Sequence, residues 1–329
     1  MMFGMQESWI VMVLALALDR FLGEPSVRWH PVVWMGASLD AMQRWVFKAH
    51  AQRALFWRGA SGWLVLAIAW VACAWLVQWG LAQLHWGVAC LLTAVLLKPM
   101  FAWRMLRGEA LAVEHALRQS LVQGQQQLAR LVSRDVHRLQ PAQVRESAIE
   151  SLAENFNDSV FAPLFWFVLL GLPGAVLYRF ANTADAMWGY PGWRAGRDWQ
   201  WAGKWAARAD DVLSYLPARL TALALLVANG RVIQKSGVGW RRMLERLIHN
   251  ARQTPSPNSG WPMSAMALLL DVRLSKPGVY VLHPDGASPG PHSLEAAARM
   301  ARRALHLACW GLGLLVSLPF WTFWLTKSL

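Results

Sequence analysis

The sequence has little charge and few cysteines. Charged residues make up 16% of the 329 residues, whereas hydrophobic residues make up 56%. A soluble chain of this length rarely carries so much apolar sequence, so the composition indicates a membrane protein. The three cysteines are Cys73, Cys90 and Cys309; each lies in an apolar stretch, and no two have the spacing of metal ligands. We therefore expect buried, unreactive thiols rather than disulfides or a structural zinc site.

The sequence also lacks the common catalytic signatures. It contains no Walker A motif and no GxGxxG, GxSxG or HExxH motif. Their absence excludes the usual phosphate-binding loops, hydrolase nucleophile elbows and zinc-peptidase helices. No Lys or Arg precedes the first apolar run, 9–18, so the charged start of a signal peptide is missing. We expect this run to be a retained first helix.

Acidic residues are scarce, and the formal net charge is +13. Nucleic-acid binding would explain such an excess, but the basic residues are spread over several loops and form no single basic helix or arm. Three regions rich in Lys and Arg, 23–59, 104–158 and 230–305, alternate with apolar segments. The positive-inside rule predicts that these regions are cytoplasmic and that the N-terminus is outside. We therefore expect no nucleic-acid partner.

Six apolar segments are candidates for crossing the membrane. The clearest are 8–22, 60–81, 86–103 and 306–326. Segment 159–180 is ambiguous because it contains the break Gly171-Leu172-Pro173-Gly174, and segment 212–229 is ambiguous because it contains Pro217 and Arg219. The charge rule allows six crossings, or four if both ambiguous segments are re-entrant. Broken helices at membrane depth often build sites.

The predicted fold is all-α. It is a polytopic membrane helical bundle of four to six spans, with re-entrant or broken helices and cytoplasmic helical loops. We treat 1–329 as a single integral-membrane domain with a cytoplasmic helical insertion at about 104–158 and a cytoplasmic region at about 230–305. In the insertion an apolar stripe that includes Met105 and Leu117 predicts a helix that Gly124 interrupts, and Pro141 suits the first turn of a second helix.

An acidic stripe is predicted on that second helix. Glu146, Glu150, Glu154 and Asp158 follow one another at intervals of four residues. Like charges at this spacing destabilise a bare helix, so arginines, a divalent cation or solvent must compensate. The stripe runs directly into the apolar segment at Val160, where carboxylates are costly unless they bind something. Carboxylate oxygens suit Mg²⁺, although a solvated face would show the same spacing.

Polar residues form three further clusters. They are Asn182 to Asp185, then Arg208, Asp210, Asp211 and Arg219, and finally the segment 256–262, SPNSGWP, which includes Asn258. The second cluster also fits an internal set of salt bridges, and the third also fits a proline turn. His30 precedes Pro31 near the N-terminus, and a lone histidine is more often structural than catalytic.

Together these stretches resemble one family, the adenosylcobinamide-phosphate synthases, which are cobalamin-biosynthesis membrane proteins of the CbiB/CobD type. The resemblance rests on segments in the family's order: DRFLGEP with WHPVVWMG (19–36), VSRD (132–135), ESLAENFNDSVFAPLFW (150–166), ANTADAMWGY (181–190), AARADDVLSYLPARLTAL (206–223) and SPNSGWP. Four positions depart from the pattern: Glu24 stands where Asp is common, Ser133 replaces Gly, Ser214 replaces Asn, and Pro191 follows Tyr190 in place of a basic residue.

The resemblance implies a reaction and its partners. The family joins the carboxyl group of adenosylcobyric acid, a corrinoid, to (R)-1-amino-2-propanol or its O-phosphate, with ATP and Mg²⁺. It also implies a multi-pass protein of the bacterial inner membrane, in contact with membrane lipid, whose site faces the cytoplasm. Other late cobalamin-pathway membrane enzymes are further candidate partners. Because ATP is cytoplasmic, a shared site favours the re-entrant form of segment 159–180.

The resemblance also implies residue roles. Glu154, Asp158 and Asp185 are the expected Mg²⁺ and catalytic acids, and His30 is the expected proton carrier. The expected phosphate- and substrate-binding residues are Arg134, Asn155, Asn182, Arg208, Asp210, Asp211, Arg219 and Asn258. Two alternatives belong to other classes: a signalling protein of the same superfamily implicated in β-lactamase induction, which a degraded acidic set would favour, and a transporter, which broken helices would fit.

Overall fold

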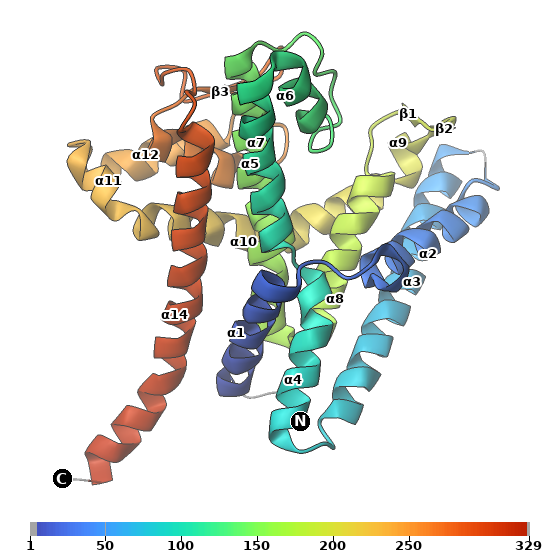
Figure 1. Cartoon of the computed structure of the whole chain (residues 1–329). Helices are drawn as coiled ribbons and strands as arrows, with labels where there is room; N and C mark the ends of the chain where they lie inside the picture. The colour runs from blue at the N-terminus through green and yellow to red at the C-terminus, as the bar shows by residue number, and fades with distance from the viewer. Residues whose placement is uncertain (1–4, 50, 328–329) are drawn as a thin grey trace. The chain divides into compact units, whose positions relative to one another are not determined.

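The computed structural model describes the backbone of residues 5–49 and 51–327 and the side chains of 6–49 and 51–314. Helices dominate the described chain, and its strands form two short hairpins (Figure 1). The all-α expectation is therefore confirmed. The helices are α1 (Met5–Leu22), α2 (Pro31–Val46), α3 (Gln52–Leu81), α4 (Trp86–Leu97), α5 (Trp103–Gln119), α6 (Leu121–Leu128), α7 (Pro141–Phe156), α8 (Ala162–Trp188), α9 (Trp199–Ala202), α10 (Lys204–Ala228), α11 (Gly230–Lys235), α12 (Trp240–Ala251), α13 (Gly260–Leu270) and α14 (Ser293–Lys327).

The shorter elements connect these helices. Two 3₁₀ turns cover Val27–Trp29 and Lys98–Met100, and a π-helix, Asn157–Phe161, joins α7 to α8. Strands β1 (Trp193–Arg194) and β2 (Arg197–Asp198) form one antiparallel hairpin. Strands β3 (Leu274–Lys276) and β4 (Tyr280–Leu282) form the other, with Ser275 opposite Val281.

The chain divides into two compact units. The first unit contains Met1–Ala102, Ala162–Ser214 and Gly313–Leu329. The second unit contains Trp103–Phe161 and Tyr215–Leu312. The segments 104–158 and 230–305, which the charge pattern assigns to the cytoplasm, both belong to the second unit.

Four helical stretches are long and apolar enough to cross a membrane: Gln52–Leu81, Trp86–Gln119, Pro141–Trp188 and Lys204–Ala228. Two of them contain the expected spans 60–81 and 86–103, a third contains the ambiguous segment 159–180, and the fourth contains 212–228 of the ambiguous segment 212–229. The expected span 8–22 forms α1, but α1 carries Glu7, Asp19 and Arg20 and is not among the four. The expected span 306–326 extends beyond residue 314, outside the described side chains.

Helix α3 presents an apolar face to its surroundings. Its exposed side chains include Leu64, Ile68 and Trp75, as a lipid-facing helix requires. Cys73 is exposed on this helix, whereas Cys90 and Cys309 are buried, and all three are free. The expectation of buried thiols is thus wrong for Cys73, because an apolar stretch in a membrane helix has an outer face.

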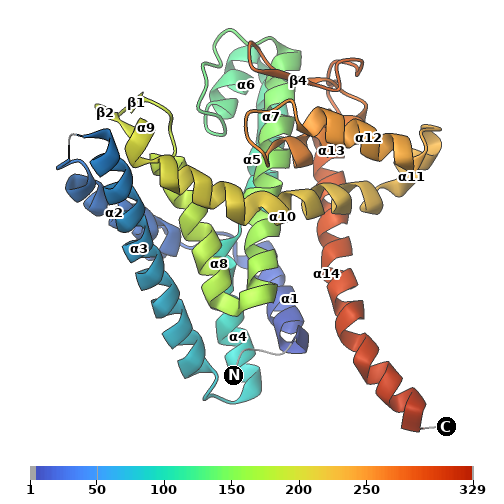
Figure 2. The same ribbon diagram turned by 180° about the vertical axis from the view of Figure 1, so that it is seen from behind.

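Helix α8 is broken into a hairpin. Gly171 adopts φ 69° and ψ −157°, and its neighbour Leu172 donates its backbone N–H to Gln78 Oε1 at 2.7 Å. A Cβ on Gly174 would lie 2.3 Å from the carbonyl oxygen of Trp166, although residues eight apart in a straight helix are about 12 Å apart. The chain therefore reverses at Gly171-Leu172-Pro173-Gly174, as Figure 2 shows. The predicted break is confirmed. The two halves of α8 run in opposite directions, so the helix begins and ends at the same end of the hairpin.

Helices α5, α6 and α7 pack together in the second unit. Leu106, Val113 and Leu117 on α5 are buried, whereas Met105 is about half exposed and lies outside the stripe assigned to it. The interruption falls at Ser120, whose hydroxyl caps α6 by accepting from Gln123 N–H, and Gly124 lies inside α6. Gly124 packs so closely on Leu117 that a Cβ would lie 2.6 Å from Leu117 Cδ1. The glycine therefore serves helix packing rather than a break.

Candidate functional site

The first half of the acidic stripe on α7 is buried and paired. Glu146 accepts a hydrogen bond from Ser275 Oγ at 2.6 Å, and Arg273 Nη2 lies 3.9 Å from its other oxygen. Glu150 accepts a hydrogen bond from Arg134 Nη2 at 2.7 Å. Both carboxylates are buried, so a solvated face is excluded for them. Burial raises the pKa of Glu150 despite Arg134, and its Oε1 has no hydrogen-bond partner in the described part of the chain.

Tyr280 of β4 lies beside this pair. Burial raises the pKa of its phenol, and the neighbouring Glu150 carboxylate raises it further, so the hydroxyl stays protonated. Arg134 Nη1 is buried and has no hydrogen-bond partner in the described part of the chain. An Arg nitrogen that is buried without a protein acceptor fits the expected role of Arg134, because a bound phosphate or carboxylate would supply the acceptor.

The second half of the stripe is more accessible. Glu154, Asn155 and Asp158 are all partly exposed. Asp158 lies in the π-helix, where Asn157 Nδ2 donates to Asp158 Oδ1 at 2.7 Å, and Thr221 Oγ1 on α10 donates to Asn157 Oδ1 at 2.9 Å. π-Helical turns inside α-helices recur at functional sites. The chain thus holds Asp158 by a two-step hydrogen-bond relay while leaving it accessible.

Arg219 of α10 is fixed against the segment SPNSGWP. Its Nη1 donates to Tyr215 O at 2.6 Å and to Asn258 Oδ1 at 3.2 Å. The guanidinium also stacks on the rings of Tyr215 and Trp261, 3.4 Å and 4.7 Å from their centroids. The structure therefore brings the predicted residues Arg219 and Asn258 together, and their contact holds the segment 256–262 to α10.

The first unit holds a second group of predicted residues. Asn182 Nδ2 on α8 donates to Asp210 Oδ1 on α10 at 3.4 Å. Asp185 is partly exposed, one turn further along α8, and a Cβ on Gly189 would collide with its carboxylate. Arg208 is exposed and Asp211 is partly exposed on α10.

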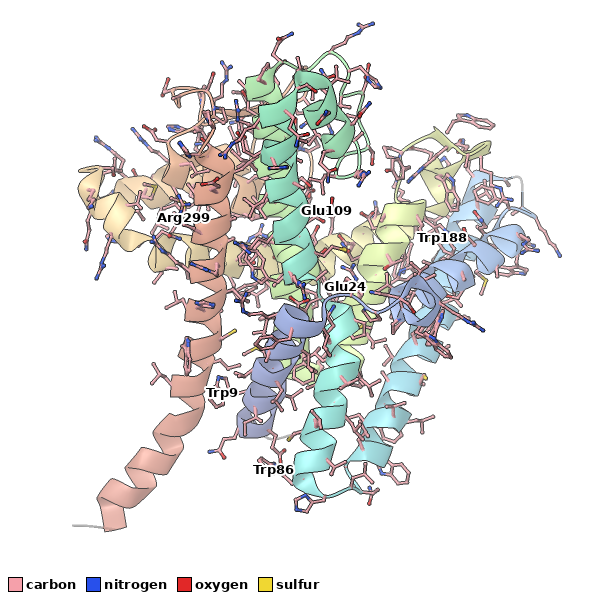
Figure 3. All side chains as sticks on the ribbon, in the orientation of Figure 1. Trp9, Glu24, Trp86, Glu109, Trp188 and Arg299 are labelled. Atoms are coloured by element: carbon pink, nitrogen blue, oxygen red, sulfur yellow. The ribbon has the colours of Figure 1, made fainter. Side chains whose placement is uncertain are left out.

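His30 belongs to a charged cluster in the first unit. Lys98 Nζ lies 2.7 Å from Glu24 Oε1 and 3.4 Å from Asp19 Oδ1, and both Lys98 and Asp19 are buried. His30 Nδ1 accepts from Val32 N–H, which caps α2, so Nε2 carries the proton that bonds Glu24 at 3.2 Å. Glu24, labelled in Figure 3, follows α1. Burial raises the pKa of Glu24, but hydrogen bonds from His30 and Lys98 outweigh burial and lower it.

The comparisons with known proteins agree over most of the chain. The family model described as CobD/Cbib protein matches residues 12–308. The chain belongs to this family. A probable cobalamin biosynthesis protein CobD of Methanothermobacter thermautotrophicus is 41% identical over 272 residues, which cover 83% of this chain and 86% of the relative. A cobalamin biosynthesis protein CobD of Chromobacterium violaceum is 39% identical over 320 residues, covering 92% and 94%. No solved structure matches.

The residues predicted for Mg²⁺ in this CobD/Cbib chain fall in different units. Glu154 and Asp158 belong to the second unit and Asp185 to the first. Among the described residues no three His, Cys, Asp or Glu side chains are already arranged to hold a metal ion. Mg²⁺ needs only one or two protein carboxylates when substrate phosphates and water supply the remaining oxygens. The partly exposed pair Glu154 and Asp158 fits that requirement.

Sequence reasoning missed several charged and polar partners in this CobD/Cbib chain. Lys98 neutralises Asp19 and Glu24, and Ser275 and Tyr280 accompany the acidic stripe. Lys98 carried a usable signal, because a lysine inside the apolar segment 86–103 requires a buried acidic partner. Ser275 and Tyr280 carried none, since only the fold brings β3 and β4 beside α7.

Proposed function

We propose that this protein joins the carboxyl group of adenosylcobyric acid to (R)-1-amino-2-propanol or its O-phosphate, using ATP. As a member of the CobD/Cbib family, the chain is a protein of cobalamin biosynthesis. The product is adenosylcobinamide or its phosphate, and the enzyme is a carbon–nitrogen ligase of the acid–amine type. We further propose that it resides in the bacterial inner membrane with its site on the cytoplasmic side, where ATP is found.

The chemistry requires activation of a carboxylate. In the first step a carboxylate oxygen of the corrinoid takes the γ-phosphoryl group of ATP, which gives an acyl phosphate and ADP. In the second step the amine nitrogen attacks the acyl carbon, inorganic phosphate leaves, and the nitrogen loses a proton. Phosphoryl transfer of this kind depends on positioning and on stabilising charge. It therefore needs cations beside the phosphates and acids that can hold a metal ion.

The observation that carries the proposal is the division of the acidic stripe on α7. Its inner members, Glu146 and Glu150, are buried, and each is bonded by a protein side chain. Its outer members, Glu154 and Asp158, remain partly exposed at the π-helix. Carboxylates that stay accessible beside an apolar segment can supply oxygen ligands to Mg²⁺, which supports the proposal.

We assign roles within the second unit accordingly. Glu154 and Asp158 would hold Mg²⁺, which would neutralise phosphate charge during transfer. Arg134 would donate its unpartnered Nη1 to a phosphate or to the substrate carboxylate. Asn155 donates its amide N–H to Ser151 O at 2.9 Å, which fixes the side chain so that its carbonyl oxygen can orient a substrate group. Arg219 and Asn258, which contact each other, would together bind phosphate or substrate.

In the first unit Asp185, Asn182, Arg208, Asp210 and Asp211 keep the metal- and substrate-binding roles that the family resemblance implies. His30 remains the proposed proton carrier, with Nε2 as the donating atom. Among the relatives reported above, all are named for cobalamin biosynthesis, so the sensor and transporter alternatives gain no support.

Complementation tests the proposal. A bacterial strain lacking the aminopropanol-coupling step, supplied with cobyric acid, should grow when it carries the wild-type gene. Asp158→Asn should not restore growth, although the protein is present in the membrane. Asp285→Asn is the matched control, because Asp285 is an exposed aspartate of the same unit outside the stripe, and it should restore growth fully.

Two outcomes would count against the proposal. If cobinamide restores growth of the strain but the wild-type gene does not, the coupling reaction is not the function of this chain. If Asp158→Asn restores growth as well as Asp285→Asn does, the reaction stands but the acidic stripe is not part of its site.

A further inference from the structure

A basic pocket lies in the second unit between α5 and the beginning of α14. Its cavity volume is about 430 Å³, within the range of about 300–1,000 Å³ that small-molecule pockets occupy. Arg107, Arg118, Arg299 and Arg302 line it together with His115, Glu114 and Glu295. Arg299 is labelled on α14 in Figure 3. Four arginines against two glutamates give the pocket an excess of positive charge. None of these residues belongs to the candidate functional site.

The two glutamates are already used by other arginines. Glu114 accepts from Arg145 Nε at 2.7 Å and lies 3.5 Å from Arg118 Nε. Glu295 accepts from Arg118 Nη2 at 3.1 Å and lies 3.8 Å from Arg299 Nη1. Through these contacts Arg118 bridges α5 and α14.

Arg107 and Arg302 differ from the other arginines of the pocket. Within the described part of the chain, neither side chain forms a hydrogen bond or an ion pair, and both are exposed. Each presents up to five N–H donors in a planar fork that matches phosphate oxygens. Arg107 and Arg302 are therefore the arginines of the pocket whose positive charge no carboxylate of the described residues neutralises.

The position of Arg107 and Arg302 relative to two apolar segments indicates the source of the ligand. Arg107 on α5 follows the end of the apolar segment 86–103 by four residues, and Arg302 on α14 precedes the start of the apolar segment 306–326 by four residues. Four helical residues span about 6 Å. The headgroup layer lies within about 5–7 Å of the hydrocarbon core. Taking the ends of these two apolar segments as the edge of the core, both arginines stand in the sequence at the spacing of lipid phosphates.

We propose that this pocket binds one phosphate-bearing anion between Arg107 and Arg302, and that the source is the headgroup of an anionic phospholipid. The phosphate would join α5 to α14 at the membrane surface, as the contact between Arg118 and Glu295 joins them further away from it. The site is independent of the coupling reaction.

Lipid binding to the purified full-length protein in detergent tests this proposal. The probes are dioctanoyl phosphatidylglycerol, dioctanoyl phosphatidylcholine, and glycerol 3-phosphate as a soluble phosphate. Native mass spectrometry gives the number of bound molecules, and the shift of the melting temperature with probe concentration gives the affinity. We expect one tightly bound phosphatidylglycerol, with binding of phosphatidylcholine and of glycerol 3-phosphate weaker by about tenfold or more.

The deciding variant is Arg107→Ala with Arg302→Ala. Its affinity for phosphatidylglycerol should fall by about tenfold or more, because charge-assisted hydrogen bonds are lost. The matched control is Arg242→Ala with Arg246→Ala, which removes the same charge from exposed positions of α12 in the same unit. It should bind as the wild type does. If the double variant fails to fold, Arg107→Gln and Arg302→Gln should each show a smaller loss of affinity.

Three results would overturn the proposal. An equal loss in the control pair would mean that general surface charge attracts the lipid. Equal affinity for phosphatidylcholine would mean that the site does not select anions. Glycerol 3-phosphate binding as tightly as phosphatidylglycerol would assign the pocket to a soluble phosphate and refute the lipid source.

Discussion

The two units compensate their buried and partly buried carboxylates differently. In the first unit Asp19 and Glu24 share one cation, Lys98, and His30 completes the cluster. In the second unit each buried carboxylate of α7 has its own partners: Ser275 and Arg273 for Glu146, and Arg134 for Glu150. In the first arrangement one buried lysine serves two carboxylates, whereas the second spreads the compensation over several residues.

The contrast also separates structural acids from candidate functional ones. A buried carboxylate with its cation in place stabilises the fold only as long as both remain. A partly exposed carboxylate contributes little to stability and stays accessible to a ligand. On this criterion Asp19 and Glu146 are structural, and Glu154 and Asp158 are candidates for chemistry.

Replacing Lys98 should have the largest effect on stability. Lys98→Met removes the cation from the buried Asp19 and the partly exposed Glu24, and breaking a buried ion pair costs about 3–5 kcal/mol. We expect the detergent-solubilised variant to melt at a much lower temperature or to be recovered as aggregate. Fluorescence-detected size exclusion and thermal melting measure this directly.

The control for that result is the triple variant Lys98→Met, Asp19→Asn, Glu24→Gln. It removes the carboxylate charges together with the lysine, so most of the lost stability should return. A Lys98→Met protein as stable as the wild type would show that the cluster does not hold the first unit together.

Replacing the outer acids of α7 should affect activity and spare the fold. Glu154→Gln and Asp158→Asn should each lower the coupling rate about a hundredfold or more, as expected when a group that stabilises charge in the transition state is removed. Their melting temperatures should stay close to that of the wild type. Steady-state kinetics on purified protein, together with melting curves, separate the two effects.

Replacing Glu146, a buried acid of the same helix, should leave the coupling activity unchanged. Glu146→Gln keeps an acceptor for Ser275 and loses only a charge whose arginine partner is about half exposed, so the stability loss should be about 1 kcal/mol or less. Its coupling rate should match that of the wild type. A loss of rate as large as that of Asp158→Asn would mean that the whole stripe, buried part included, is functional.

The smallest expected effect is a pH dependence at Glu24. Its folded pKa lies below its ordinary value of 4.5, so the ionised form stabilises the fold above that pH and this contribution is lost as the pH falls through the folded pKa. The melting temperature of wild type should therefore exceed that of Glu24→Gln at neutral pH, and the difference should shrink below about pH 4.5. A difference independent of pH would assign the effect to packing rather than charge.

Local sequence signals predicted the parts of the fold that depend on neighbouring residues. Glycine and proline at 171–174 marked the reversal in α8, and Pro141 marked the start of α7. The acidic stripe followed from helical periodicity alone. The prediction that Gly124 interrupts the helix was wrong, because a glycine that permits close helix packing cannot be distinguished in sequence from one that ends a helix.

Contacts between distant segments could not be predicted in this way. The burial of Glu146 and Glu150 depends on the β3–β4 hairpin and on Arg134, and nothing in the spacing of the stripe reveals them. The relay from Thr221 through Asn157 to Asp158 likewise joins two helices far apart in the chain. The roles of the candidate site residues stay predictions until they are measured.

The coupling reaction of the purified protein tests the central claim most directly. The protein in detergent or nanodiscs would receive ATP, Mg²⁺, adenosylcobyric acid and (R)-1-amino-2-propanol or its O-phosphate, with product mass and ADP release as readouts. We expect one ADP per amide formed, with product from wild type and Glu146→Gln and at least about a hundredfold less from Asp158→Asn. A folded wild-type protein that forms no amide with either amine would contradict it.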